Sequence, residues 1–422
     1  MIFYEILFLV LIIIPVIWNF LQTYYLLRSN NIKLKSETSS SEEHKSFSFI
    51  IAEKNEREET IDELINNLLS LDYDDYEIII VSDDPPEIFK EKYKKYKNIE
   101  RIKIVNRINP KGRKAGALNY GVSLAKNEYL VFLDADGRVD KDFLRKISKL
   151  NFDILALRIR IYNAETQVQK YYKDFTEKVM DSLFKARYYL GLPIFPNGSA
   201  LCIKKDVLIK LGEWKESLVT EDLELGIRAF LKGYKIKYAD DIVVYSLAPF
   251  TLDDLYSQIE RWSYGSAQLL FTSLKMLKKG IVGVEGLFYS QQWGIYGLFI
   301  LALSIFSALN FILNIPAFIY LFAITLYALS LGLYSITYKA KVSDIKLPIV
   351  LLNASISGYI KGLLKLPFSW KVTPKVKEDK EEQEKTNLIV PIILLFSFIN
   401  LIEGQLFASL VLLFIGLMES VV

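Results

Sequence analysis

Cysteine and histidine are almost missing from this 422-residue chain, which contains one of each, Cys202 and His44. A single cysteine excludes a disulfide framework and a cysteine-based zinc site. The single histidine lies in the polar segment 36–46 and excludes Ser-His-Asp or Cys-His catalysis, which needs a positioned imidazole. Any chemistry must therefore come from carboxylates, from Lys or Arg, or from a bound metal.

An excess of one charge is also missing. The 52 Lys and Arg residues nearly balance the 49 Asp and Glu residues, and the net charge is +3, so we expect no nucleic-acid partner. Apolar sequence, in contrast, is abundant: 51% of the residues are hydrophobic and the mean hydropathy is +0.22. Because the excess is concentrated in residues 1–27 and beyond about residue 287, we expect a soluble domain combined with membrane segments.

Residues 1–28 predict an N-terminal transmembrane anchor. About 20 apolar residues cross the hydrocarbon core, and Arg28, Lys33 and Lys35 follow this segment. Basic residues favour the cytosolic side, so the linker of residues 29–46 and the domain after it are expected in the cytosol. The alternative is a buried core helix. We predict a multi-pass protein of the cell membrane, with the lipid bilayer as a partner.

The C-terminal part of the chain predicts further membrane segments. We expect interfacial helices over 266–292, two transmembrane helices over 293–337, an interfacial helix and a loop over 338–386, and a C-terminal transmembrane segment over 387–422. The lysine-rich stretch 371–385 favours a cytosolic position for that loop. For the last segment, a tilted helix and a tight hairpin both fit.

Residues 47–265 predict an α/β domain with a parallel sheet, because short apolar runs alternate with helical patterns. The expected strands are 47–51, 77–81, 102–105, 129–133 and 154–161, and the expected helices are 60–71, 87–97 and 111–124. An amphipathic helix near 168–184 fits a membrane interface and the surface of the sheet equally well. Ligands of parallel sheets collect where the strands end, and four aspartates fall there: Asp83, Asp84, Asp134 and Asp136.

Two of these aspartates, Asp134 and Asp136, follow a buried strand directly and precede a turn. Paired carboxylates at a strand end suit a hard divalent cation that keeps positions open for phosphate oxygens. An acidic turn without a metal is the alternative. The position at the end of the fourth strand favours a site for Mg²⁺ or Mn²⁺.

The segment 111–119 opens a helix with two glycines and three cations, among them Lys114. Backbone N–H groups at a helix N-terminus attract anions, and cations there add charge and donors. Cations at this end oppose the helix dipole, so a purely structural role would have a stability cost. The pattern favours a diphosphate site.

A carboxylate pair, Glu221 and Asp222, precedes another helical pattern, where capping of the helix is the simple alternative. Capping does not explain the residues that follow. Gln258, Arg261 and Trp262 stand at i, i+3 and i+4 and share one face of a helix. That face offers an amide, donors for an anion and an apolar plate for a sugar ring.

Together these residues resemble the processive family 2 glycosyltransferases, the cellulose and hyaluronan synthases and their relatives, over roughly residues 47–376. The matching pieces, in order, are Asn55-Glu56, Asp83-Asp84, Lys114-Ala115-Gly116-Ala117-Leu118-Asn119, Asp134-Ala135-Asp136, Phe195-Pro196-Asn197-Gly198-Ser199, Thr220-Glu221-Asp222, Gln258-Ile259-Glu260-Arg261-Trp262 and Trp370-Lys371-Val372-Thr373-Pro374-Lys375. The last piece is similar to the gating loop of those synthases. The order and spacing of the set make the resemblance specific.

The resemblance implies a GT-A-like fold, a UDP-sugar donor, Mg²⁺ or Mn²⁺, and inversion at the anomeric carbon. Asp222, with Glu221 beside it, would deprotonate the acceptor hydroxyl of a saccharide or a lipid. The implied nucleotide-sugar contacts are Asp83, Asp84, Lys114, Asp134, Gln258, Arg261, Thr373 and Lys375. The implied acceptor contacts are Trp262, Asn197 and Gly198, and the implied metal ligands are Asp136 and Asp134.

The chain also departs from the family pattern. Ala52-Glu53-Lys54 replaces small or aromatic residues, Pro85-Pro86 follows the aspartate pair, and only one N-terminal span is expected. We predict a membrane-integral enzyme that extends a polysaccharide. The alternatives are a single sugar addition to a membrane lipid, as in ceramide glucosyltransferases, and a transporter or inactive scaffold.

Overall fold

The computed structural model describes residues 2–33, 44–341, 346–368 and 389–420. The chain divides into two compact units, which we treat separately. The sheet unit comprises Ser29–Pro249 and Phe271–Leu287. The helical unit comprises Met1–Arg28, Phe250–Leu270 and Phe288–Val422.

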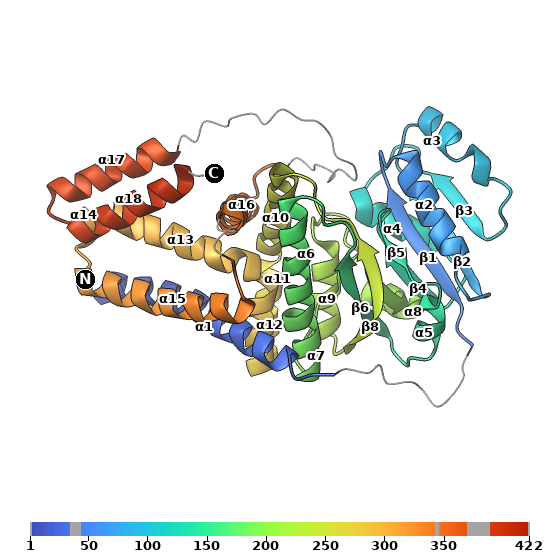
Figure 1. Cartoon of the computed structure of the whole chain (residues 1–422), viewed down its shortest axis with the longest axis horizontal. Helices are drawn as coiled ribbons and strands as arrows, with labels where there is room; N and C mark the ends of the chain where they lie inside the picture. The colour runs from blue at the N-terminus through green and yellow to red at the C-terminus, as the bar shows by residue number, and fades with distance from the viewer. Residues whose placement is uncertain (1, 34–43, 342–345, 369–388, 421–422) are drawn as a thin grey trace. The chain divides into compact units, whose positions relative to one another are not determined.

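The sheet unit is built on one eight-stranded sheet in the order β3-β2-β1-β4-β7-β6-β8-β5 (Figure 1). The strands are β1 (Phe47–Glu53), β2 (Tyr76–Ser82), β3 (Ile102–Asn106), β4 (Tyr129–Leu133), β5 (Arg138–Val139), β6 (Ile154–Ile161), β7 (Leu201–Lys204) and β8 (Ile236–Ser246). The predicted α/β class is confirmed, and all five predicted strands are present. The prediction of a parallel sheet is right for β1 to β4 and for the β6–β8 pair. It is wrong for β7, which runs antiparallel to both β4 and β6, and for β5, which runs antiparallel to β8.

Helices cover both faces of this sheet. They are α2 (Glu58–Leu69), α3 (Pro86–Lys92), α4 (Arg113–Leu124), α5 (Phe143–Ser148), α6 (Gln167–Val179), α7 (Arg187–Tyr189), α8 (Lys205–Leu211) and α9 (Glu221–Leu231). The segment Phe271–Leu287 of the same unit contains most of α11 (Leu270–Leu274) and α12 (Ile281–Ser290). Side chains alternate along a strand, so Phe49 of β1 packs with the α2 side of the core. Its neighbour Ile50 faces α4, where a Cβ on Gly121 would lie 2.6 Å from Ile50 Cγ2. The predicted amphipathic helix is α6, which packs against β6.

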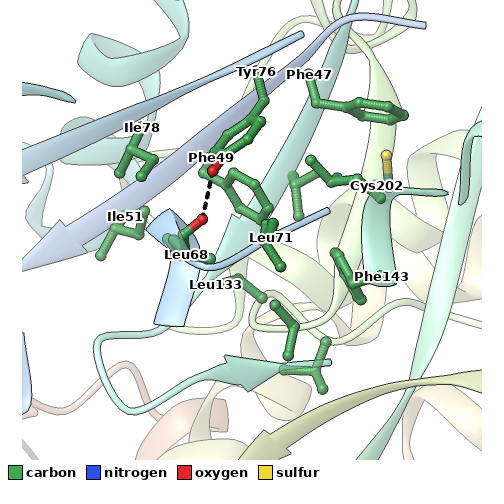
Figure 2. Packing of buried hydrophobic residues seen from close by; sticks show 14 of the residues in the cluster. Phe47, Phe49, Ile51, Leu68, Leu71, Tyr76, Ile78, Leu133, Phe143 and Cys202 are labelled. Carbon is green, nitrogen blue, oxygen red and sulfur yellow. Dashed lines mark hydrogen bonds between the residues drawn. The ribbon is translucent and has the colours of Figure 1, made fainter. Parts of the chain in front are cut away.

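Figure 2 shows the core between α2 and the sheet, with Phe49 at its centre. The Phe49 ring meets Tyr76 edge-on at 5.9 Å and stacks on Phe143 at 6.3 Å between centroids. The Tyr76 hydroxyl donates to the carbonyl of Leu68 at 2.7 Å, which satisfies this buried polar group. Cys202 lies in the same cluster, and burial raises the pKa of its thiol, so it behaves as a small apolar residue.

We expect Phe49→Ala to cost about 3–5 kcal/mol of stability, because it removes a fully buried ring and leaves a cavity. Thermal unfolding of the whole protein in detergent measures the effect. Ile108→Ala is the matched control, since Ile108 is 78% exposed and surface truncations stay within about 0.5 kcal/mol. Equal shifts of Tm for the two variants would contradict this assignment of the core.

The helical unit contains α1 (Ile2–Ser29), α10 (Leu252–Gln268), α13 (Gln292–Ala308), α14 (Asn310–Leu313), α15 (Ala317–Tyr338), α16 (Lys346–Leu363), α17 (Ile389–Ile402) and α18 (Leu406–Ser420). Among the described residues, Phe3–Ser29 and Ala317–Tyr338 are long and apolar enough to cross a membrane, and a third span results if α12 and α13 count as one. The predicted C-terminal segment is a hairpin, because Gly404 turns the chain at φ 72° between α17 and α18.

Helix α16 packs closely against α10, the helix that carries Gln258, Arg261 and Trp262. A Cβ on Gly358 of α16 would lie 2.1 Å from the carbonyl oxygen of Glu260, so only glycine fits there. Lys361 pairs with Glu260 at 2.6 Å. Small residues allow such close helix approach in membrane proteins. The interfacial position expected for the helix within 338–386 remains a prediction.

Candidate active site

The candidate active site lies where the parallel strands of the sheet unit end. Asp83 and Asp84 follow β2, and Asp134 follows β4. Strands β2 and β4 both run parallel to β1, so their carboxyl ends meet at one edge of the sheet. This is the edge where open α/β sheets bind ligands.

Lys114 brings the predicted anion site and the predicted base together. Its ammonium donates to Oδ1 of Asp134 at 2.5 Å. Burial by itself would lower the pKa of Lys114, but neighbouring carboxylates outweigh it, and the pKa is raised. In order of decreasing effect these are Asp134, Glu221 and Asp222. A charged ammonium thus lies among the carboxylates of two segments nearly 90 residues apart in the chain.

Asp222 is held in place by two backbone donors. It lies in the first turn of α9, and the N–H of Gly198 donates to its Oδ2 at 2.9 Å. The N–H of Leu223 donates to its Oδ1 at 2.8 Å. Thr220, the N-cap residue, makes no side-chain capping bond, so the simple capping interpretation does not hold for it. The carboxylate is half-buried and has a fixed orientation.

The loop 193–198 lies against the start of α9 through two glycines. A Cβ on Gly198 would lie 3.3 Å from Cβ of Asp222, and a Cβ on Gly226 of α9 would lie 2.8 Å from Cβ of Phe195. Any larger residue at Gly226 would push the loop away. Asn197 is half-buried in the same loop, and its carbonyl accepts from the N–H of Ala200 at 3.0 Å. The loop therefore carries both the Gly198 donor and the predicted acceptor contact.

Asp136 joins the ends of two strands. Its Oδ2 accepts from the hydroxyl of Ser246 at 2.8 Å and from the N–H of Leu247 at 2.9 Å. The side chain is buried, whereas Asp134 is about one-third exposed (34%). The two carboxylates flank a tight turn in which the N–H of Gly137 donates to the carbonyl of Asp134.

This pair of carboxylates fits a divalent cation of the expected kind. Within the described part of the chain, no group of three or more His, Cys, Asp or Glu side chains is arranged for a metal. Mg²⁺ is commonly held by one or two carboxylates together with phosphate oxygens of the substrate. Asp134 and Asp136 match that donor set, in which the ligand completes the site.

Asp83 binds another residue of the protein, Arg107, in this structure. Both of its carboxylate oxygens accept from the guanidinium of Arg107, at 2.7 and 2.6 Å. The same guanidinium donates to the carbonyls of Lys111 at 2.8 Å and Arg113 at 3.1 Å. Arg107 thus holds the loop that leads into α4 and Lys114. Sequence reasoning missed Arg107. The pattern that could have indicated it is a cation at the end of one strand and an aspartate at the end of the neighbouring strand.

Asp84 is buried with a cation that the sequence analysis also missed. Its carboxylate pairs with Lys92 and accepts from the N–H of Asn55 at 2.5 Å. Lys92 also pairs with Glu53 at 3.2 Å, and burial raises the pKa of Glu53. The Asp84 side chain is fully enclosed (0% exposed), so its predicted contact with a nucleotide base requires a rearrangement of this cluster and remains a prediction.

The remaining predicted contacts belong to other parts of the chain. Gln258, Arg261 and Trp262 lie on α10 in the helical unit. The Trp262 ring lies 5.3 Å from that of Trp293, an aromatic neighbour that the sequence analysis did not single out. The approach of this face to Asp222 remains a prediction. Thr373 and Lys375 lie outside the described residues.

The chain is similar to known glycosyltransferases. Residues 129–335 match the model of Glycosyl transferase family group 2. A probable glycosyltransferase of Sulfolobus acidocaldarius is 29% identical over 392 residues, 85% of this chain and 83% of that protein. A poly-beta-1,6-N-acetyl-D-glucosamine synthase of Staphylococcus aureus is 29% identical over 234 residues, 54% of this chain and 56% of the synthase.

A solved structure is similar over most of the chain. A mannosyltransferase from Pyrobaculum calidifontis, in complex with GDP-Man and Mn²⁺, has a TM-score of 0.58 and 17% identity, over 85% of this chain and 100% of that one. The likeness confirms the expected GT-A-like fold. The family match over residues 129–335 and the similarity to the Sulfolobus acidocaldarius protein support the activity of a glycosyltransferase. The protein is a glycosyltransferase.

Proposed function

We propose that this protein is a membrane-integral, inverting glycosyltransferase that moves a sugar from a UDP-sugar onto a growing polysaccharide. The observation that carries the proposal is the cluster of Lys114, Asp134 and Asp222 in the sheet unit, with Asp222 fixed by the N–H of Gly198. A positioned carboxylate can accept a proton from an acceptor hydroxyl. A nearby ammonium can stabilise a departing diphosphate.

The proposed reaction forms one bond and breaks another at the anomeric carbon. The acceptor oxygen attacks this carbon while Asp222 takes its proton, and the bond to the diphosphate oxygen breaks on the opposite face. Lys114, Gln258 and Arg261 would stabilise the negative charge of the leaving nucleoside diphosphate. Trp262 would orient the acceptor sugar by stacking. A cation held by Asp134 and Asp136 would add positive charge beside the diphosphate.

The membrane part of the proposal rests on apolar and basic surface. Two described helices are long enough to span. The segment 271–287 belongs to the sheet unit, and its side chains Phe271 and Ile281 are 77% and 81% exposed. Three lysines lie in the same segment, at 275, 278 and 279, and no acidic residue precedes Glu285 there. Exposed apolar side chains beside lysines are typical of helices at an anionic bilayer surface.

The name of the staphylococcal relative, a poly-beta-1,6-N-acetyl-D-glucosamine synthase, supports a polymer product. The mannosyltransferase bound to GDP-Man and Mn²⁺ supports a nucleotide sugar and a divalent cation. A second candidate is the addition of one sugar to a membrane lipid. The small number of long apolar helices in the described part of the chain favours it, because polymer export needs enough helices to enclose a channel.

A donor screen with the purified full-length protein tests the proposal. We expect nucleotide release from one UDP-sugar to exceed release from GDP-mannose at least tenfold, because the site would recognise the uridine diphosphate and the sugar together. Labelled product then separates the two candidates, since a polymer and a single lipid band differ in size. Absence of release from every nucleotide sugar, in the presence of membranes as acceptor, would refute the proposed activity.

A further inference from the structure

A buried arginine lies behind the loop that touches Asp222. Arg187 has a fully buried side chain (0% exposed) and forms an ion pair with Glu285 of α12. One of its nitrogens, Nη2, donates to Oε2 of Glu285 at 2.8 Å and also to the carbonyl oxygen of Pro193. All three residues belong to the sheet unit. A single guanidinium therefore connects a distant carboxylate to the start of the loop 193–198.

From Pro193 the contacts lead directly to the proposed base. Phe195 and Pro196 lie against Gly226 of α9, where a Cβ would come within 2.8 and 2.9 Å of them. Two residues further on, the N–H of Gly198 donates to Asp222 at 2.9 Å. The loop is held at its beginning by Arg187 and presents its donor to Asp222 at its end.

The segment that carries Glu285 also contacts both sides of this arrangement. A Cβ on Gly286 would lie 3.3 Å from Cγ of Pro193 and 3.4 Å from Sδ of Met276. The turn Lys275–Lys279 packs against α9. Glu285 is therefore fixed with respect to the loop and to the helix of Asp222 at the same time.

We propose that Arg187 and Glu285 are positioning residues that orient Asp222 through the loop 193–198. This inference rests on the proposed role of Asp222 as base. A buried ion pair adds little stability compared with apolar residues of similar size, so stability alone does not explain it. A guanidinium, in contrast, has a planar set of donors that can bind a carboxylate and a carbonyl together. The Arg187–Glu285 pair instead holds the loop 193–198 in a fixed conformation.

Arg187→Lys tests the inference, because lysine keeps the charge but loses the fork that spans Glu285 and Pro193. We expect kcat for sugar transfer to fall about 10- to 100-fold, the effect of a small misplacement of a reacting group. The donor KM and the binding of the nucleotide, measured by calorimetry, should change less than about threefold. The matched control is Arg158→Lys, another buried arginine of this unit, which pairs with Glu177, Asp181 and Asp240. We expect it to lower Tm without lowering kcat.

A double variant separates positioning from stability. Arg187→Met with Glu285→Leu replaces the ion pair by apolar contacts, which commonly restore stability, but it offers no donor to Pro193. We expect Tm near that of the native protein and a kcat that stays at least tenfold low. Recovery of kcat along with Tm would overturn the inference, as would a normal kcat in Arg187→Lys.

The inference and the proposed function fail in different ways. If Asp222→Asn loses transfer while Arg187→Lys keeps it, only the positioning role is wrong. If Asp222→Asn keeps transfer, the base assignment is wrong, and the positioning role falls with it. A rise of more than tenfold in the donor KM of Arg187→Lys, at unchanged kcat, would assign Arg187 to donor binding and overturn the inference as well.

Discussion

Asp222→Asn should abolish sugar transfer while the nucleotide sugar still binds. An amide does not take a proton from the acceptor hydroxyl, and general-base catalysis contributes about 10²- to 10⁴-fold to a rate. Lys114 and Asp134, the proposed donor contacts, form an ion pair at 2.5 Å that does not include Asp222, so we expect this pair to persist in the variant. We therefore expect kcat to fall by at least 10²-fold and the dissociation constant for the donor to change by less than about threefold. Nucleotide release and calorimetric titration measure the two quantities.

The substitution has a predictable structural cost. Both oxygens of Asp222 accept a backbone N–H, from Gly198 and from Leu223. Asparagine has one oxygen, so its amide nitrogen faces one of the two donors, and we expect a loss of about 1–3 kcal/mol of stability. Asp206→Asn is the matched control, since Asp206 is exposed and pairs with Lys210 on its own helix α8. Turnover within tenfold of the native rate would discard Asp222 as the base, and Glu221→Gln would then be the next test.

Much of the sheet could be predicted because its signals are local. Strands β1, β2, β3 and β4 are short apolar runs between turns, and each lies within one or two residues of its predicted range. A strand buried on both faces is apolar throughout, which makes it visible without a partner. The positions of Asp83 and Asp134 follow directly, since each aspartate comes right after its strand.

The rest of the sheet depends on contacts that a linear pattern does not contain. Strand β7 has only four residues and pairs antiparallel with β4, more than 60 residues earlier. Strand β8 has a register shift beside Leu157 of β6, and its own sequence is interrupted by Asp240 and Asp241. Polar residues within a strand hide its alternation, so neither the short strand nor the irregular one was predicted.

The ion-pair partners of the site residues likewise could not be predicted from the sequence. The sequence shows Asp83 and Asp84 as a pair, yet each binds a different cation, Arg107 for the first and Lys92 for the second. One carboxylate holds a loop and the other is enclosed in the core. Only the fold decides which of the 52 Lys and Arg residues lies beside a given aspartate.

Two guanidinium groups in the sheet unit have the same arrangement. Arg107 is bound by Asp83 and donates to carbonyls of the loop before Lys114. Arg187 is bound by Glu285 and donates to a carbonyl of the loop before Gly198. In each case a carboxylate fixes the arginine, and the arginine fixes the backbone of a loop that ends at a proposed site residue. The loops next to Lys114 and Asp222 are thus each held by an arginine whose position a carboxylate fixes.

Removal of divalent cations should stop transfer, and Mn²⁺ or Mg²⁺ should restore it. The cation would be held by Asp134 and Asp136 together with the diphosphate, because two carboxylates alone form an incomplete set of ligands. We expect chelation with EDTA to lower turnover at least 10²-fold. We also expect the protein to bind Mn²⁺ much more tightly in the presence of UDP, which calorimetry measures without any turnover.

Asp136→Asn makes this prediction specific to the site. The loss of one charged ligand should raise the Mn²⁺ concentration for half-maximal turnover at least tenfold. Asp140→Asn is the matched control, because Asp140 is exposed and only four residues further along the chain. The amide can still accept from Ser246 or Leu247 through its oxygen, so the variant should fold, and unchanged thermal unfolding checks this. If both variants respond to Mn²⁺ like the native protein, or if EDTA leaves turnover intact, the cation does not bind at this turn.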